Sequence, residues 1–304
     1  MCIRSNRADG HQPSFRLEFR SGSGASGLAC WLALPETVAH DAIPLVAVHG
    51  IRRGAELQAA LFARRATALG RPVIAPIFDK ARWLGYQQVL LCGRADLALL
   101  DLILSLRRNG IVRSEQIDLF GFSGGAQFAH RFAMLHPERI ANLSIASPGW
   151  YTFPDDASYP YGLWPRPDFE DVWSYRMVNS LDQFLSIPMQ VCVGEKDCKR
   201  DKNTRSGNAI DAQQGSHRLD RARRWTGALR AAARQLSVNP DIKFHILPNC
   251  GHDFEACVRQ GGLDRIVVPH PSPGQCRGGC SATARAACFR SRQRSSTKLE
   301  EAIL

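Results

Sequence analysis

One serine in the sequence occupies a position suited to nucleophilic chemistry. Ser123 is the centre of a G-x-S-x-G motif at residues 121–125, with an apolar run before it at 116–120 and an amphipathic stretch after it at 124–136. A serine at a sharp turn from a strand into a helix projects its hydroxyl group, and glycines two positions away on each side relieve backbone crowding. The N-terminus of the following helix also favours developing negative charge. This pattern predicts that Ser123 is a nucleophile on a nucleophile elbow.

A serine hydroxyl needs a base that removes its proton and a carboxylate that orients the base. Among the nine histidines, His252 is the predicted base because it lies in a turn just after the last predicted strand, where the chain returns to the carboxyl edge of the sheet. His245 lies inside that strand and fits a packing role. His130 and His136 lie on the helix after Ser123 and are expected to face away from the turn.

The acid is predicted from a turn that follows the preceding strand. Residues 193–197 read Val-Gly-Glu-Lys-Asp, which puts Asp197 at the carboxyl end of the strand before the histidine strand. Asp201, four residues further on, could take its place. Asp171 and Asp182, which follow an earlier strand, are the remaining alternatives. The predicted order along the chain is therefore nucleophile, acid and base.

Acyl transfer also requires N–H donors for the oxyanion that forms during the reaction. The backbone N–H of Gly124, directly after the nucleophile, is one predicted donor of the oxyanion hole. The other is the N–H of Ile51, because Gly50 lets the backbone approach closely after the first parallel strand. His49 and Gly50 could also form a plain turn at a strand end. The two arginines at 52–53 could meet an anionic substrate or be surface charge.

The elements that must position these groups alternate along the chain. Two segments at 15–20 and 28–34, separated by a turn rich in glycine and serine, predict an antiparallel hairpin. Further strands are predicted at 44–49, 72–76, 116–120, 140–147, 189–193 and 242–247, with helices at 55–69, 96–108, 124–136 and 215–236. Repeated strand–helix units predict an α/β fold with a mostly parallel central sheet and helices on both faces.

Residues 148–187 interrupt this alternation. The segment is too aromatic for a flexible linker and too rich in proline for one helix. We expect an ordered cap insertion over the site, with Trp150 and Tyr151 in contact with the substrate. The alternative is that these aromatic side chains pack onto the core.

The candidate residues occur in a familiar order. The HG turn at 49–50, the G-x-S-x-G motif, the G-x-x-D turn at 194–197 and the G-H turn at 251–252 make the chain resemble the α/β-hydrolase superfamily over about residues 13–264. Within it, the chain is similar to bacterial serine esterases related to polyhydroxyalkanoate depolymerases and dienelactone hydrolases. The resemblance implies an α/β-hydrolase fold and hydrolysis of a carboxylic ester through an acyl-enzyme, with no metal and no organic cofactor. Amide or thioester hydrolysis, or a non-catalytic member that binds a ligand or partner, are the alternatives.

Net positive charge is concentrated in the residues that follow the region similar to the α/β-hydrolases. The chain carries a net charge of +11, and residues 265–304 hold seven basic against two acidic residues, with no usable periodicity. We expect a basic, disordered tail or a shifted reading frame there. Five arginines between 218 and 230 are expected on a solvated helix face, with phosphate or nucleic-acid binding as the alternative. We therefore expect a small-molecule ester as partner and no nucleic acid. The oligomeric state is not predicted.

Other classes of site have weak support. No run approaches the roughly 18 apolar residues of a membrane-spanning helix. Residues 1–7 lack the apolar segment of a secretory signal, so we expect a cytoplasmic protein without a membrane partner. Cys276 and Cys280 beside His270 come nearest to a metal-ligand cluster, but they lack a second ligand pair, so no metal site is predicted.

Overall fold

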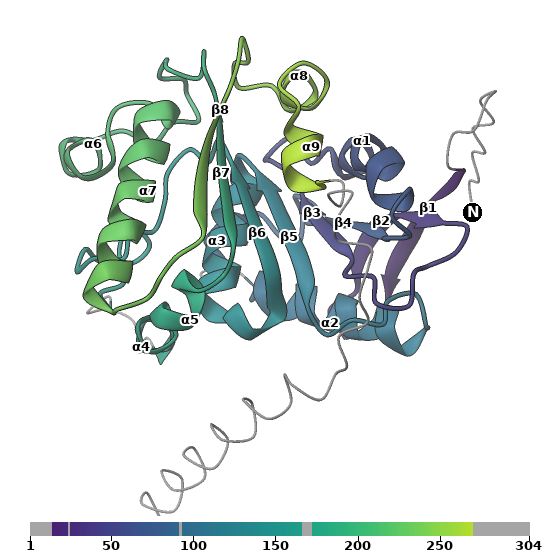
Figure 1. The fold of residues 1–304 in the computed structure, drawn as a ribbon. Helices are drawn as coiled ribbons and strands as arrows, with labels where there is room; N and C mark the ends of the chain where they lie inside the picture. Colours follow the sequence, from purple (N-terminus) through teal and green to yellow (C-terminus); the bar gives the residue numbers. More distant parts are fainter. Residues whose placement is uncertain (1–13, 24, 91–92, 166–171, 270–304) are drawn as a thin grey trace, which may run out of the picture. The chain divides into compact units, whose positions relative to one another are not determined.

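A computed structural model describes residues 14–23, 25–90, 93–165 and 172–269. The predicted tail beyond residue 269, with Cys276, Cys280 and His270, lies outside them. The described residues belong to one compact unit that ends at Pro269. They contain a central sheet with helices on both of its faces (Figure 1).

The sheet of the described residues has eight strands in the order β1-β2-β4-β3-β5-β6-β7-β8. Their bounds are β1 (Phe15–Ser23), β2 (Leu28–Pro35), β3 (Leu45–Val48), β4 (Val73–Ile77), β5 (Ile117–Phe122), β6 (Ile140–Ala146), β7 (Met189–Gly194) and β8 (Ile242–Leu247). The pairs β1–β2 and β2–β4 are antiparallel, whereas every pair from β4 through β3 to β8 is parallel. The central strands β3 and β5 are buried at every residue, as expected for strands covered on both faces. The predicted α/β fold with a mostly parallel sheet is confirmed.

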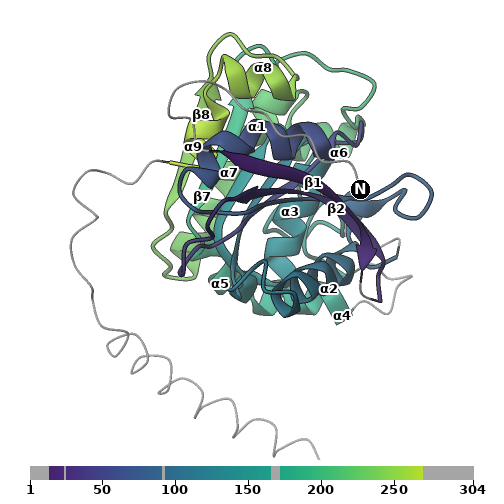
Figure 2. The same ribbon diagram turned by 90° about the vertical axis from the view of Figure 1, so that its right-hand side faces the viewer.

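Two layers of helices bury the sheet. On one face, α1 packs with α8 and α9 around Phe62, Phe120 and Leu263. On the other, α2, α3 and α7 form the larger core with Leu99, Phe128 and other apolar side chains; Figure 2 shows α1 on the face of the sheet opposite to α2 and α3. The helices are α1 (Ala55–Thr67), α2 (Ala95–Arg108), α3 (Gly124–Leu135), α4 (Val172–Asn179), α5 (Leu181–Leu185), α6 (Asn208–Gln214), α7 (Arg218–Gln235), α8 (Phe254–Arg259) and α9 (Leu263–Val267), with short 3-10 helices η1 (Tyr86–Gln88) and η2 (Pro137–Arg139).

The described residues of the predicted cap segment form a crossover that packs along α3 and α7. β6 ends at the carboxyl end of the parallel strands, where Ser123 lies, and its neighbour β7 begins at their amino end. The segment between them therefore has to run back along the sheet. Its first part is fixed by Thr152, whose carbonyl accepts from the Trp225 indole N–H on α7 at 2.8 Å. Its last part lies beside the end of α3, where Ser180 donates to the carbonyl of Met134. Figure 1 shows α4 and α5 at the edge of the sheet far from α8.

The folded unit also extends past the boundary predicted at residue 264. α9 crosses that boundary, and Leu263, Val267 and Val268 are buried against the α1 face of the sheet. These apolar side chains recur with helical spacing, which explains why the chain stays in the core up to this point.

Candidate active site

Ser123 lies at a strained turn between β5 and α3. Its φ is 55° and its ψ is −114°, a conformation that non-glycine residues rarely adopt. Neighbouring glycines make the turn possible: a Cβ on Gly121 would overlap the carbonyl oxygen of Gly125, and a Cβ on Gly125 would overlap that of Val48. The Ser123 N–H donates to the carbonyl of Ala146 at 2.8 Å, which ties the turn to β6. The local sequence therefore produces the sharp turn that the motif predicts.

The three predicted triad residues form one chain of hydrogen bonds. The Ser123 hydroxyl lies 3.0 Å from His252 Nε2, and His252 Nδ1 lies 2.8 Å from Asp197 Oδ2. Because Nδ1 faces a carboxylate, it carries the proton, and Nε2 is left to accept the serine proton. The Phe122 ring stacks on the imidazole with ring centroids 5.1 Å apart. His252 is therefore oriented as a base toward Ser123.

The loops that follow β7 and β8 bring the acid to the base. Lys196 N–H donates to the carbonyl of Cys250 at 2.8 Å, and Asn249 N–H donates to a carboxylate oxygen of Glu195 at 2.8 Å. These bonds join the two loops side by side at the carboxyl ends of adjacent parallel strands. Of the alternative acids, Asp182 lies on α5 at the far edge of the sheet, and Asp171 lies outside the described residues.

The two predicted oxyanion donors are neighbours. A Cβ placed on Gly124 would lie only 3.4 Å from the backbone nitrogen of Ile51. A Cβ placed on Gly50 would lie 3.3 Å from the Ser123 Cβ, so the loop after β3 approaches the nucleophile as closely as glycine permits. The backbone of Ile51 and that of Gly124 thus flank the space beside the serine hydroxyl.

His49 holds the loop after β3 in place through hydrogen bonds. Its Nε2 accepts from the backbone N–H of Phe78 at 3.1 Å, its Nδ1 lies 2.8 Å from the carbonyl of Gly50, and its own carbonyl accepts from the Tyr86 hydroxyl at 2.6 Å. Burial lowers the pKa of His49 to about 4, so the ring is neutral near pH 7 and both contacts are available. The alternative that His49 and Gly50 form only a plain turn does not account for this set of bonds.

Arg53 also holds this loop in place through hydrogen bonds, a role that the sequence did not indicate. Its Nε donates to the carbonyl of Phe78 and its Nη1 to that of Ile51, both at 2.8 Å. The guanidinium also lies over the Tyr86 ring, 5.7 Å from its centroid. Two adjacent arginines after an HG turn give no signal of these long-range backbone contacts. Arg52, in contrast, lines the cavity beside Ser123.

The expected solvated helix face is wrong for two of the five arginines between residues 218 and 230. Arg223, Arg224 and Arg230 are exposed, whereas the side chains of Arg218 and Arg221 are buried. Arg221 donates to the carbonyl of Gly215 and pairs with Asp211. Arg218 reaches the triad: its Nη1 lies 3.2 Å from Asp197 Oδ1 and its Nη2 lies 2.9 Å from Asp201 Oδ1.

Asp201 therefore binds Arg218 instead of replacing Asp197. It accepts from both Arg218 and the Thr204 hydroxyl. Burial acts to raise the pKa of Asp201, but the hydrogen bonds from Arg218 and Thr204 outweigh it and hold that pKa below its usual range. Asp201 is thus a carboxylate across the working pH range.

A cavity of about 270 Å³ opens in front of Ser123. Apolar side chains of Ile51, Leu57 and Phe254 line one part of it, and Asp201 and Asn203 line another. None of the described residues of the crossover contributes to its lining. Trp150 packs on the Arg131 guanidinium and Tyr151 stacks on Trp225 with ring centroids 4.6 Å apart. Neither Trp150 nor Tyr151 lines this cavity, whereas Ile51, Leu57 and Phe254 do.

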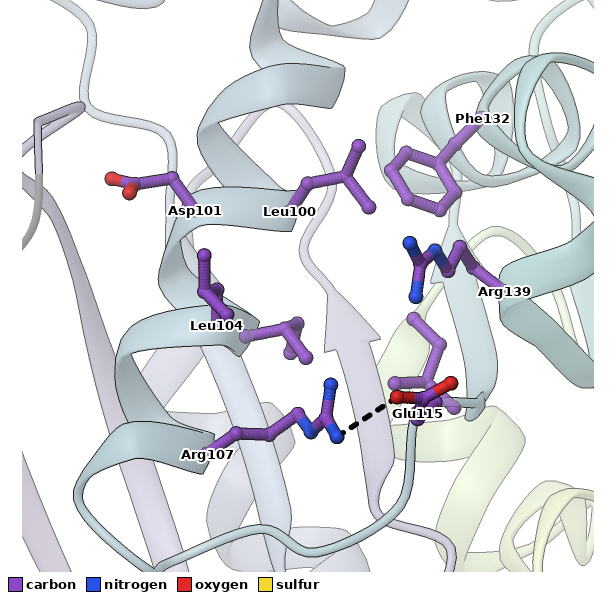
Figure 3. A pocket seen from close by; sticks show the side chains of 9 residues that line it. Leu100, Asp101, Leu104, Arg107, Glu115, Phe132 and Arg139 are labelled. Atoms are coloured by element: carbon purple, nitrogen blue, oxygen red, sulfur yellow. Dashed lines mark hydrogen bonds and ion pairs between the residues drawn. The ribbon is translucent and has the colours of Figure 1, made fainter.

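A second cavity, of about 290 Å³, lies at the opposite edge of the sheet (Figure 3). It is bounded by α2, the first residue of β5, α3 and η2. Leu100 and Phe132 face each other inside it, and Arg107 pairs with Glu115 at its rim at 3.1 Å. None of the predicted catalytic residues lines it, so the cavity beside Ser123 is the candidate active site.

Two further findings limit the kinds of site in the described part of the chain. No group of three or more histidine, cysteine, aspartate or glutamate side chains there could hold a metal ion. None of its helices combines the length and the apolar character that crossing a membrane requires.

Comparison with known proteins identifies the fold. No family model matches the sequence, and no curated protein matches it. Among solved structures, poly(aspartic acid) hydrolase-1 from Sphingomonas sp. KT-1 is 21% identical, with 84% of this chain and 97% of that chain covered and a TM-score of 0.67. A poly(3-hydroxybutyrate) depolymerase from Bordetella parapertussis is 25% identical, with 79% and 82% covered and a TM-score of 0.64.

A more distant neighbour has the same arrangement of elements. An S-formylglutathione hydrolase from Agrobacterium tumefaciens is 14% identical, with 88% of this chain and 97% of that chain covered and a TM-score of 0.55. These three neighbours are named as hydrolases or a depolymerase, and this chain shares their fold. The fold is that of the α/β-hydrolase superfamily, and within it the chain resembles bacterial esterases and depolymerases.

Proposed function

We propose that the protein is a serine hydrolase that cleaves a small carboxylic ester through an acyl-enzyme. The observation that carries this proposal is the continuous hydrogen-bond chain from Ser123 through His252 to Asp197, beside two backbone N–H groups. A ligand-binding protein without catalysis has no need for a serine on a strained turn within 3.0 Å of an oriented imidazole. We therefore favour the enzyme over the binding protein.

The reaction begins with the serine. Ser123 Oγ attacks the carbonyl carbon of the ester while His252 Nε2 removes the hydroxyl proton. Asp197 holds the imidazole in place and stabilises the positive charge that it gains. The negative charge on the former carbonyl oxygen is stabilised by the N–H groups of Ile51 and Gly124, which act in the oxyanion hole.

The acyl-enzyme then forms and breaks down. His252 gives its proton to the leaving alcohol oxygen as the C–O bond breaks, which leaves the acyl group on Ser123. Water loses a proton to His252 Nε2 as it attacks the acyl carbon, and Ser123 Oγ leaves with that proton. The cycle releases one acid and one alcohol and requires no cofactor.

The cavity limits the size of the acyl group. At about 270 Å³ it lies below the roughly 300–1,000 Å³ that is typical of sites for drug-sized ligands. Ile51, Leu57 and Phe254 give it an apolar wall. We propose that short aliphatic acyl groups, of about two to four carbons, are hydrolysed faster than long ones.

Hydrolysis of p-nitrophenyl acetate, butyrate and laurate by the wild type and by Ser123→Ala tests the proposal. We expect the wild type to hydrolyse the short esters, and the variant to be slower by at least about 10³-fold. A matched thioester and amide of the same acyl group separate ester cleavage from the alternative reactions. Equal rates for wild type and Ser123→Ala would rule out a role for this serine as the nucleophile.

A further inference from the structure

The carboxylate of the triad is held by a buried arginine on its other oxygen. Asp197 is 2% exposed, and while Oδ2 faces His252, Oδ1 lies 3.2 Å from Arg218 Nη1. Arg218 is the first residue of α7 and is itself 1% exposed. The backbone N–H of Leu219, the next residue, donates to the Asp197 carbonyl at 3.2 Å. The start of α7 therefore fixes both the backbone and the side chain of the acid.

A buried arginine beside a triad acid has an electrostatic consequence. The positive charge of Arg218 would cancel the negative charge of Asp197 and weaken its ability to stabilise a protonated His252. Asp201 supplies the missing charge: both of its oxygens lie within 3.0 Å of Arg218 Nη2. It remains ionised, since Thr204 and the backbone N–H of Asn203 also donate to it.

The charges of this cluster change with the state of His252. With a neutral imidazole, Asp197, Arg218 and Asp201 carry one net negative charge. When His252 holds the serine proton, the net charge of the four groups is zero. A partly buried cluster that reaches neutrality only with the proton on the imidazole favours the state formed in the transition state over the resting state.

We propose that Arg218 and Asp201 are positioning residues that orient the Asp197 carboxylate and set the charge balance of the triad. This inference rests on the proposed function, because it concerns the same site. Arg218 supplies two donors in a fixed fork, which a lysine cannot reproduce. Asp201 restores the charge that this fork would otherwise remove.

Two other ionisable groups near the cluster are buried. Burial raises the pKa of the Tyr151 phenol and that of the Cys257 thiol, so both stay neutral near pH 7. Arg221 follows Arg218 by one turn of α7 and pairs with Asp211. Besides Asp201, the charged residues that line the cavity are Arg52, Asp253 and Glu255. All of these groups remain unchanged in the Arg218 and Asp201 variants below, so a difference between those variants reports the cluster itself.

The decisive experiment compares the directions in which two substitutions shift the acidic limb of the pH profile of kcat/KM. Loss of positive charge in Arg218→Met should move the acidic limb of the pH profile of kcat/KM to higher pH, because protonated His252 is favoured. Loss of negative charge in Asp201→Asn should move it to lower pH. We expect each shift to be about half a pH unit or more. Arg218→Lys keeps the positive charge but loses the two fixed donors of the guanidinium. We therefore expect a lower kcat, with the acidic limb of the pH profile close to its wild-type position.

Matched controls separate this role from a structural one. Arg131→Met removes another fully buried arginine, and Asp211→Asn removes another carboxylate that pairs with an arginine of α7. Both are expected to leave the acidic limb at its wild-type position. If Arg218→Met does not fold, Asp201→Asn decides alone, because Asp201 is 40% exposed and its loss leaves no buried cavity.

A second readout keeps this inference distinct from the proposed function. The titration of the His252 imidazole is followed by NMR in the same variants without substrate, with His252→Gln to assign the signal. Opposite shifts for Arg218→Met and Asp201→Asn support the inference even if no ester is hydrolysed, which would count against the proposed function alone. An unmoved midpoint in Asp201→Asn, or shifts of the same sign in both variants, would overturn it while leaving ester hydrolysis by Ser123 intact.

Discussion

A methyl group at Gly124 would intrude directly on the proposed oxyanion hole. The Cβ of Gly124→Ala would lie 2.9 Å from Ile51 Cγ2, 3.0 Å from the Tyr86 hydroxyl oxygen and 3.4 Å from the Ile51 nitrogen. The first two separations are shorter than ordinary contacts, so a neighbour has to move. Tyr86 is buried and donates to the His49 carbonyl at 2.6 Å, whereas the Ile51 side chain is 42% exposed. The loop that bears Ile51 is therefore the part that yields.

Displacement of Ile51 removes one of the two N–H donors from the oxyanion. The loss of one such donor lowers turnover by about 10²–10³-fold, which corresponds to about 3–4 kcal/mol. We expect kcat/KM of Gly124→Ala for p-nitrophenyl butyrate to fall by this amount. The thermal unfolding midpoint should change little, because the exposed Ile51 side chain can shift without opening the core.

Gly227→Ala is the matched control. Gly227 lies inside α7, and no atom lies within 4 Å of the Cβ that alanine would add. Alanine in a helix interior is more stable than glycine by about 0.5–1 kcal/mol, so this variant should be slightly more stable and fully active. Steady-state kinetics and a circular dichroism melt of both variants complete the test. A folded Gly124→Ala enzyme with a rate within twofold of the wild type would refute the assignment of Ile51 and Gly124 to the oxyanion hole.

Three further outcomes follow from buried charged and titratable groups. His49 binds a proton near pH 6.5 when unfolded and only near pH 4 when folded, so stability should fall by about 3 kcal/mol as the pH drops through this window; urea unfolding between pH 7 and pH 4 should show a weaker decline in His49→Gln. Burial acts to raise the pKa of Asp96, but hydrogen bonds from His136 and Arg94 lower it to about 2. Asp96→Asn should therefore cost about 2 kcal/mol at pH 7, a difference that disappears as the pH falls from about 4 to 2, and an equal loss at both ends would contradict this reasoning. Arg131→Met should destabilise the protein by about 3 kcal/mol, because Arg131 binds Thr152 of the crossover, while kcat stays within about threefold; a large loss of kcat in folded protein would instead favour a role of the crossover in catalysis.

The meeting of Ser123, His252 and Asp197 was predictable because each residue follows a strand that the sequence makes obvious. The G-x-S-x-G motif requires small residues at Gly121 and Gly125, where any side chain would overlap a neighbouring carbonyl. In a parallel sheet, turns after adjacent strands meet at one edge, which brings His252 to Asp197. Local sequence and topology together therefore determine the triad.

The surface onto which the aromatic segment at residues 148–187 packs was not predictable from its composition. Aromatic side chains such as Tyr151 indicate burial, but they do not say against which surface. The surface is decided by topology: β6 ends and β7 begins at opposite edges of the sheet, so the crossover has to leave the site. A reading of strand direction alone could have placed α4 and α5 at the far edge.

The roles of Arg218 and Arg53 depend on contacts between distant parts of the chain. The helical periodicity of α7 indicates which arginines share a face, but not that Asp197 and Asp201 meet Arg218 at its first turn. Arg53 binds carbonyl groups, which have no signature in the sequence. Such partners emerge only when the loops are assembled.

The central claim is that Ser123 is an activated nucleophile, and its covalent labelling tests this most directly. The full chain is treated with a fluorophosphonate at neutral pH, and the adduct is located by mass spectrometry of the digested protein. We predict one adduct on Ser123, with no labelling of Ser123→Ala and much slower labelling of His252→Gln. An unlabelled wild-type protein, or equal labelling of wild type and Ser123→Ala, would contradict the account.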